Sequence, residues 1–189
     1  MTDLFALLGE SPRPWVDPEA LKVKYHQLTA RQHPDVTGAP GDFAEINRAY
    51  QILSDPAARL RHLLDLESPA ALSRAQAVPG EIAAFFSPVA ESRQEVDSFL
   101  KRRAESASPL AKALLSTEQY RVQERLEEMI STLQQKQEAL FAQVREADTL
   151  WFADRPAALL TLPVLWQSLG YTGKWLAMLR ESLFRLASL

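Results

Sequence analysis

The chain has 189 residues and a net charge of -3, and 47% of its residues are hydrophobic. This composition is typical of a globular protein with one large or two small domains, and the charge gives no general reason to expect nucleic-acid binding. The absence of cysteine excludes disulfides, thiolate catalysis and cysteine-ligated metal sites. No apolar run approaches the roughly 18 residues of a spanning helix, so we expect a cytoplasmic protein without membrane contact.

The first predicted elements are a short helix over residues 3–8, which ends at Gly9, and two longer amphipathic helices over residues 17–32 and 42–53. Asp17 followed by proline is a good start for the first of the long helices. A short segment joins the two, so we expect an antiparallel helical hairpin. Apolar side chains recur at helical spacing in both: Leu21, Tyr25 and Leu28, then Phe43, Ile46, Ala49, Tyr50 and Leu53.

The segment between the two helices contains the tripeptide His33-Pro34-Asp35. Proline lacks a backbone donor and disfavours helical dihedrals at the residue before it, so the first long helix should stop there. The tripeptide is then expected at the exposed tip of the hairpin. A plain interpretation is that it only ends a helix and begins a turn.

The flanking segments 25–35 and 46–56, together with Arg59, resemble the J domain of DnaJ-type co-chaperones. The resemblance covers about the first third of the chain. It implies that His33, Pro34 and Asp35 dock on a DnaK-type ATPase chaperone, with the Asp35 carboxylate accepting a charge-assisted bond from an arginine of that partner. Basic side chains of the first long helix are candidates for the same docking face, although a solvated polar face is the simpler interpretation. They are Lys22, Lys24, His26 and Arg31.

Only helices are predicted beyond the hairpin, because no alternating strand pattern occurs. Ser54-Asp55-Pro56 predicts a helix to about Leu66. The apolar stripe from Leu126 to Val144 fits an antiparallel bundle or a coiled coil. A last helix is expected from about Tyr171, with a bend at Gly170 and Gly173. We therefore predict an all-α protein, with a J domain followed by a helical bundle of at least three helices.

Catalytic and metal-binding patterns are missing from the sequence. The three histidines lack the paired spacing of a metal site on a helix, and neither a phosphate-binding glycine loop nor a nucleophile elbow occurs. We expect no metal, no cofactor and no enzymatic activity.

The N-terminal J domain, the length and the all-helical remainder together resemble the HscB family, the co-chaperones of iron–sulfur cluster assembly. Segments 85–96 and 168–176 carry the resemblance in the second part, although Gln94 and Ser98 stand where acidic side chains are expected. The helix pattern and a shift to alanine, proline and glycine predict a J domain over residues 1–67, a connector over 68–80 that can contain a helical turn, and a bundle over 81–189. The resemblance implies that this bundle binds the client. It also implies HscA as the ATPase chaperone and the scaffold protein IscU as the client. By position, the candidate scaffold contacts are Phe85, Phe86, Val89, Ala90, Glu91 and Tyr171.

Three alternatives remain open from the sequence. The apolar members of the client set can be plain core residues, since an apolar side chain on a bundle helix is more often inside than exposed. The bundle can recruit a client other than IscU. The chain can also be a helical interaction module that forms a dimer, weak or tight, through the stripe from Leu126 to Val144, which a solution mass would reveal.

Overall fold

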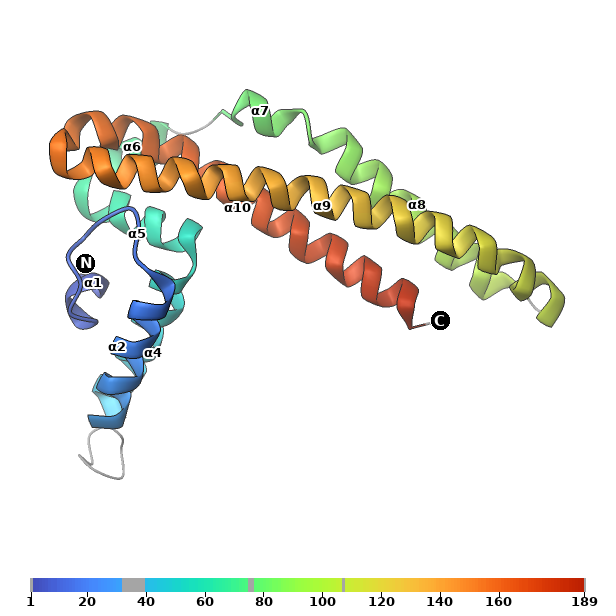
Figure 1. Ribbon diagram of the computed structural model, residues 1–189, viewed down its shortest axis with the longest axis horizontal. Coiled ribbons are helices and arrows are strands. Elements are labelled where there is room, and N and C mark those ends of the chain that lie inside the picture. The colour runs from blue at the N-terminus through green and yellow to red at the C-terminus, as the bar shows by residue number, and fades with distance from the viewer. Residues whose placement is uncertain (1, 32–39, 75–76, 107, 189) are drawn as a thin grey trace. The chain divides into compact units, whose positions relative to one another are not determined.

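The computed structural model describes residues 2–31, 40–74, 77–106 and 108–188 of the chain. Every regular element in these ranges is a helix, as predicted (Figure 1). The helices form two compact units. The first unit contains Met1–Ala77 and Leu140–Leu169, and the second contains Val78–Ala139 and Gly170–Leu189.

The first unit contains the predicted hairpin and the short helices around it. Two of its helices begin as the sequence predicts, with an aspartate cap before a proline. The Asp17 carboxylate accepts from the backbone N–H of Ala20 at 2.8 Å, and the Asp55 carboxylate accepts from Ala58 N–H at 2.6 Å. The helices are α1 (Leu4–Leu7), α2 (Pro18–Arg31), α4 (Pro40–Ser54), α5 (Pro56–Glu67) and α6 (Pro69–Arg74).

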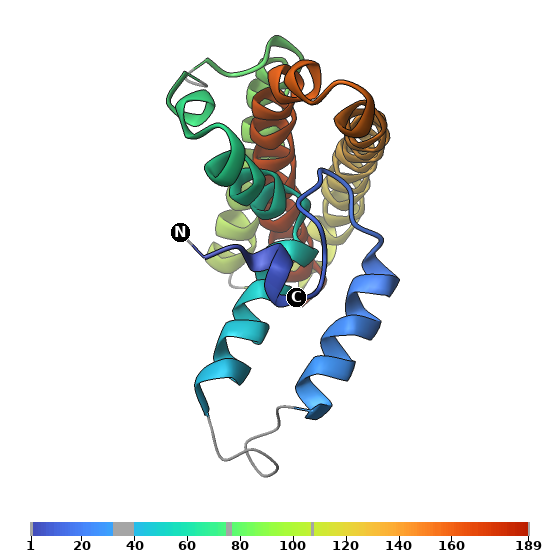
Figure 2. The ribbon, with the colours of Figure 1, turned by 90° about the vertical axis from the view of Figure 1, so that its left-hand side faces the viewer.

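Helices α2 and α4 lie side by side as the two arms of the hairpin (Figure 2). The ring of Tyr25 stacks on Tyr50 with the centroids 4.2 Å apart, and its hydroxyl donates to Oδ1 of Asn47 at 2.6 Å. Leu21 and Leu53 are fully buried beneath these contacts. The apolar stripes predicted from the sequence therefore face each other within the hairpin.

Arg59 on α5 ties the end of the hairpin to the segment before α2. Its Nε donates to the carbonyl of Pro14 at 2.9 Å, and its Nη1 donates to the carbonyl of Leu53 at 2.7 Å. The Leu53 carbonyl lies in the last turn of α4, where backbone carbonyls have no N–H donor within the helix. Burial lowers the pKa of Arg59 to about 10, so the guanidinium remains charged at neutral pH.

The core of the first unit also includes residues far along the chain, which differs from the domain boundaries expected from the sequence. Leu140, Val144 and Leu162 belong to the same buried cluster as Phe5 and Leu60. The segment 140–169 thus packs with the J-like helices rather than with the rest of an 81–189 bundle. The expected connector is also partly helical, since α6 lies within it.

The second unit contains α7 (Gly80–Ala83), α8 (Phe86–Glu105), and parts of α9 (Pro109–Ala153) and α10 (Arg155–Ala187). The apolar positions of the predicted stripe are buried in one unit or the other. Leu126 and Leu133 lie in the core of the second unit, and Leu140 and Val144 lie in the core of the first. The buried positions of the stripe therefore pack within the chain, while Met129 and Phe141 are partly exposed.

The last helix begins well before the expected start at about Tyr171, because α10 starts at Arg155 and continues through Gly170 and Gly173. A glycine inside a helix costs about 1 kcal/mol relative to alanine. Burial of Leu169 and Leu176 on the same helix offsets this cost. None of the helices in the described ranges combines the length and apolar character needed to cross a membrane.

Candidate partner-binding surfaces

The tripeptide His33-Pro34-Asp35 lies outside the described residues, so the J-domain surface is described from α2 alone. Lys22, His26 and Arg31 are exposed. The Lys24 ammonium, in contrast, has partners within the chain. Its Nζ pairs with the Glu10 carboxylate at 2.7 Å and donates to the carbonyl of Gly9 at 3.2 Å. Lys24 therefore anchors the segment before α2.

The basic residues of α2 do not share one face. An α-helix turns by about 100° per residue, so Lys22 and His26 lie on one side of the apolar stripe. Lys24 and Arg31 lie on its other side by the same geometry. Since Lys24 is already paired, the exposed positive charge of α2 is divided between Lys22 and Arg31. The basic side chains of α2 therefore lie on two sides of its apolar stripe.

An aromatic cluster joins the start of α8 to α10 in the second unit. The ring of Phe86 meets Trp175 edge-on with the centroids 5.0 Å apart, and meets Tyr171 in the same manner at 5.5 Å. Tyr171 and Trp175 are one helical turn apart, and their centroids are separated by 5.6 Å. Phe86 nevertheless remains 43% exposed. Leu110, Leu114 and Phe184 of the same unit are more exposed. Phe86 differs from them because its ring packs against two other aromatic side chains.

A groove of about 530 Å³ extends from this cluster along the line between α8 and α10. Its walls are apolar at the end near the cluster and charged further along α8. The residues that line it are Phe86, Val89, Ala90, Arg93, Gln94, Asp97, Ser98 and Lys101 of α8, with Trp175 and Met178 of α10.

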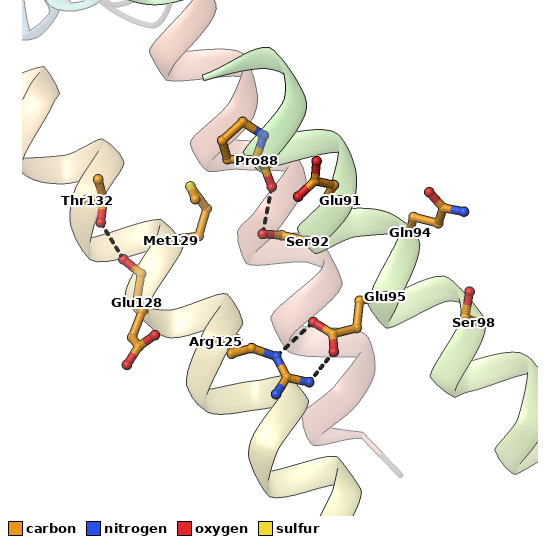
Figure 3. Close-up of a pocket in the computed structure, with 10 residues that line it drawn as sticks. All are labelled: Pro88, Glu91, Ser92, Gln94, Glu95, Ser98, Arg125, Glu128, Met129 and Thr132. Atoms are coloured by element: carbon orange, nitrogen blue, oxygen red, sulfur yellow. Dashed lines mark hydrogen bonds and ion pairs between the residues drawn. The ribbon is translucent and has the colours of Figure 1, made fainter. Parts of the chain in front are cut away.

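A second groove, of about 670 Å³, lies on the other side of α8, between α8 and α9 (Figure 3). It is polar and acidic, with Glu91, Glu95 and Glu128 against a single base, Arg125. Arg125 and Glu95 point toward each other across it, and the Arg125 Nε donates to the carboxylate at 3.0 Å (Figure 3).

The predicted client residues divide among four environments. Phe86 and Ala90 are exposed and line the α8/α10 groove. Val89 is 2% exposed and belongs to the core, so plain core packing describes it best. Glu91 lines the opposite groove. The remaining two, Phe85 and Tyr171, are partly buried around Trp175.

Trp175 and Met178 are surface residues that the sequence did not single out. Both lie on α10 at helical spacing from Tyr171, so the signal was present as an i, i+4, i+7 pattern. Their partners on α8 lie about 80 to 90 residues earlier, which no local pattern reveals. No group of potential ligands in the described residues is suited to hold a metal ion.

Comparison with known proteins identifies the first part of the chain. The family model of the DnaJ domain matches residues 3–62. The chain is 46% identical to the chaperone protein DnaJ of Thermosynechococcus vestitus over 63 residues, and 47% identical to that of Trichodesmium erythraeum over 62 residues. These matches cover 32% and 31% of this chain but only 16% of each relative. Residues 3–62 are therefore similar to the DnaJ domain, and the chain spans only about a sixth of the length of these relatives.

The fold of the chain is similar to that of a solved HscB chaperone. The solved structure of chaperone HscB from Vibrio cholerae matches it with a TM-score of 0.59, at 18% sequence identity. The match covers 95% of this chain and 96% of that one. The all-α prediction of a J domain followed by further helices is thus confirmed.

Proposed function

We propose that the protein is a J-domain co-chaperone that stimulates a DnaK/HscA-type ATPase chaperone and delivers the scaffold protein IscU to it. The DnaJ domain at residues 3–62 supports the first part of the proposal. The observation that carries the second part is the exposed ring of Phe86, held against Tyr171 and Trp175 at the head of a groove. The likeness of fold to HscB supports the same client.

The proposed mechanism needs no covalent chemistry on this chain. The tripeptide His33-Pro34-Asp35 docks on the ATPase chaperone, while the α8/α10 surface holds the client. Lys22 and His26 on one side of α2, and Arg31 on the other, provide exposed basic groups for this docking. Docking favours the hydrolysing conformation of the chaperone, so that client delivery and ATP turnover are coupled through a difference in affinity between two partner states. A non-enzymatic role and a cytoplasmic location are parts of this proposal.

The experiment measures the ATPase rate of a purified DnaK-type chaperone with this protein, in the presence and absence of IscU. We expect the protein and IscU together to stimulate far beyond either alone. Phe86→Ala should remove the IscU-dependent increment and keep the rest, because truncation of an exposed aromatic anchor costs about 2 kcal/mol of binding, or about thirtyfold in affinity.

The matched control is Phe184→Ala, which removes a different exposed phenylalanine, on α10 and outside the groove. This variant should keep the full IscU-dependent increment. An ATPase rate that the protein stimulates equally with and without IscU would point to a different client. A lack of any stimulation would contradict the co-chaperone function itself.

A further inference from the structure

The charges along the α8/α10 groove are unequal. Arg93 and Lys101 line it as bases, and Asp97 is its single acid in the described structure. Asp97 is neutralised within the molecule, because Arg185 Nη1 donates to its Oδ1 at 3.0 Å and Arg93 Nε lies 3.7 Å from its Oδ2. The part of the groove away from the aromatic cluster therefore has a net positive charge.

Lys101 is the base whose charge is least compensated. It is exposed, and none of the ion pairs formed among the described residues involves it. Glu105 lies one helical turn further along α8 but does not form an ion pair with it. At 1.5 Å per residue, Lys101 lies roughly 22 Å along α8 from Phe86. The groove therefore begins with aromatic rings and ends with a free ammonium group.

The groove on the other face of α8 has the opposite charge. Glu91, Glu95 and Glu128 line it with Arg125 as the only base, and Arg125 is already bonded to Glu95. An acidic segment is thus attracted to the α8/α10 groove and repelled from the α8/α9 groove. Complementary charge of this kind fixes the register of a bound segment and suppresses wrong partners.

We propose that the α8/α10 groove accepts a client segment with an apolar side chain at the aromatic end and an acidic side chain at the Lys101 end. The apolar side chain packs on Phe86 and Trp175, and the carboxylate pairs with Lys101 or Arg93. This inference deepens the proposed function and rests on it, because it specifies which surface of the client the groove selects.

The test compares the affinity of IscU for two charge-reversed variants by titration at low and high salt. Lys101→Glu should weaken binding at low salt by about fivefold to tenfold, since it replaces an attraction by a repulsion. It should also flatten the salt dependence of the affinity. The matched control is Arg180→Glu, an exposed base of α10 that lines neither groove, and it should bind nearly as the wild type does.

Equal or tighter binding by Lys101→Glu, or an equal loss in Arg180→Glu, would overturn the inference. If Phe86→Ala abolishes IscU binding in the same experiment, the proposed function stands even then.

A second experiment separates the groove inference from the assignment of IscU as client when IscU does not bind. Two synthetic peptides share one phenylalanine anchor, and one carries glutamates where the other carries lysines.

The wild type should prefer the glutamate peptide, and Lys101→Glu should lose or reverse this preference. This result without IscU binding would support the groove inference and contradict the client assignment. An equal affinity for the two peptides, or no binding of either, would overturn the inference.

Discussion

The Arg13 guanidinium donates from Nε to Oδ1 of Asp148 at 3.0 Å, although the two residues are 135 positions apart. The same carboxylate oxygen accepts from the backbone N–H of Trp15 at 3.0 Å. One turn further along α9, the indole of Trp151 donates to the carbonyl of Pro12 at 3.0 Å. These bonds tie the segment between α1 and α2 to α9 within the first unit.

Asp148→Ala should therefore destabilise the first unit. The substitution leaves the Trp15 N–H and part of the Arg13 guanidinium without their acceptor, and an unsatisfied polar group costs about 1 to 3 kcal/mol. Chemical denaturation should show a loss of about 2 kcal/mol in the free energy of unfolding. Glu146→Ala on the exposed side of the same helix should stay within about 0.5 kcal/mol of the wild type. Equal stability of both variants would show that the Asp148 bonds are not structural.

The stability of the J domain should fall in mild acid because of His62. Its Nε2 accepts from the backbone N–H of Leu4 at 3.1 Å, so this nitrogen carries no proton in the folded state. Burial lowers the pKa of His62. The unfolded chain therefore takes up a proton at higher pH than the folded chain, and the stabilisation present above about pH 6.5 is lost as the pH falls below it.

Thermal unfolding between about pH 7.5 and about pH 5 tests this effect. The melting temperature of the wild type should fall with acid, and His62→Gln should start lower and fall less. A decline of equal steepness in both proteins would assign the acid sensitivity to other groups.

Alanine substitutions at Lys22 and Lys24 should affect partner binding and stability separately. Lys24→Ala removes a half-exposed ion pair to Glu10 and a bond to Gly9, so the free energy of unfolding should fall by about 0.5 to 1 kcal/mol. Lys22→Ala removes an exposed charge and should leave stability unchanged while it slows association with the ATPase chaperone. Denaturation and surface binding kinetics measure the two effects. The assignment is wrong if the two variants exchange these effects.

Glu91→Ala should weaken IscU binding much less than Phe86→Ala. Glu91 lines the α8/α9 groove and accepts from the Ser87 hydroxyl at 2.9 Å, whereas Phe86 lies in the aromatic cluster on the other side of α8. We expect a loss below about threefold for Glu91→Ala, compared with about thirtyfold for Phe86→Ala. A titration with purified IscU provides both numbers. Comparable losses would mean that the client covers both grooves.

Local signals in the sequence predicted two helix starts well, whereas the last helix begins at Arg155 and not at about Tyr171. Asp17 and Asp55 each precede a proline and cap their helices as expected, because capping depends on residues within one turn. Long-range packing was not predictable in the same way. The contact of Asp148 with Arg13, the pairing of Lys24 with Glu10 and the burial of Val89 all depend on which helix faces meet.

The most direct test of the account is the ATPase rate of a DnaK-type chaperone with wild-type protein and with Asp35→Asn. Asp35 lies outside the described residues, and its proposed role rests on its position within residues 3–62, which match the DnaJ domain. We predict that Asp35→Asn keeps the melting temperature and IscU affinity of the wild type and no longer stimulates ATP hydrolysis. Full stimulation by Asp35→Asn would contradict the account.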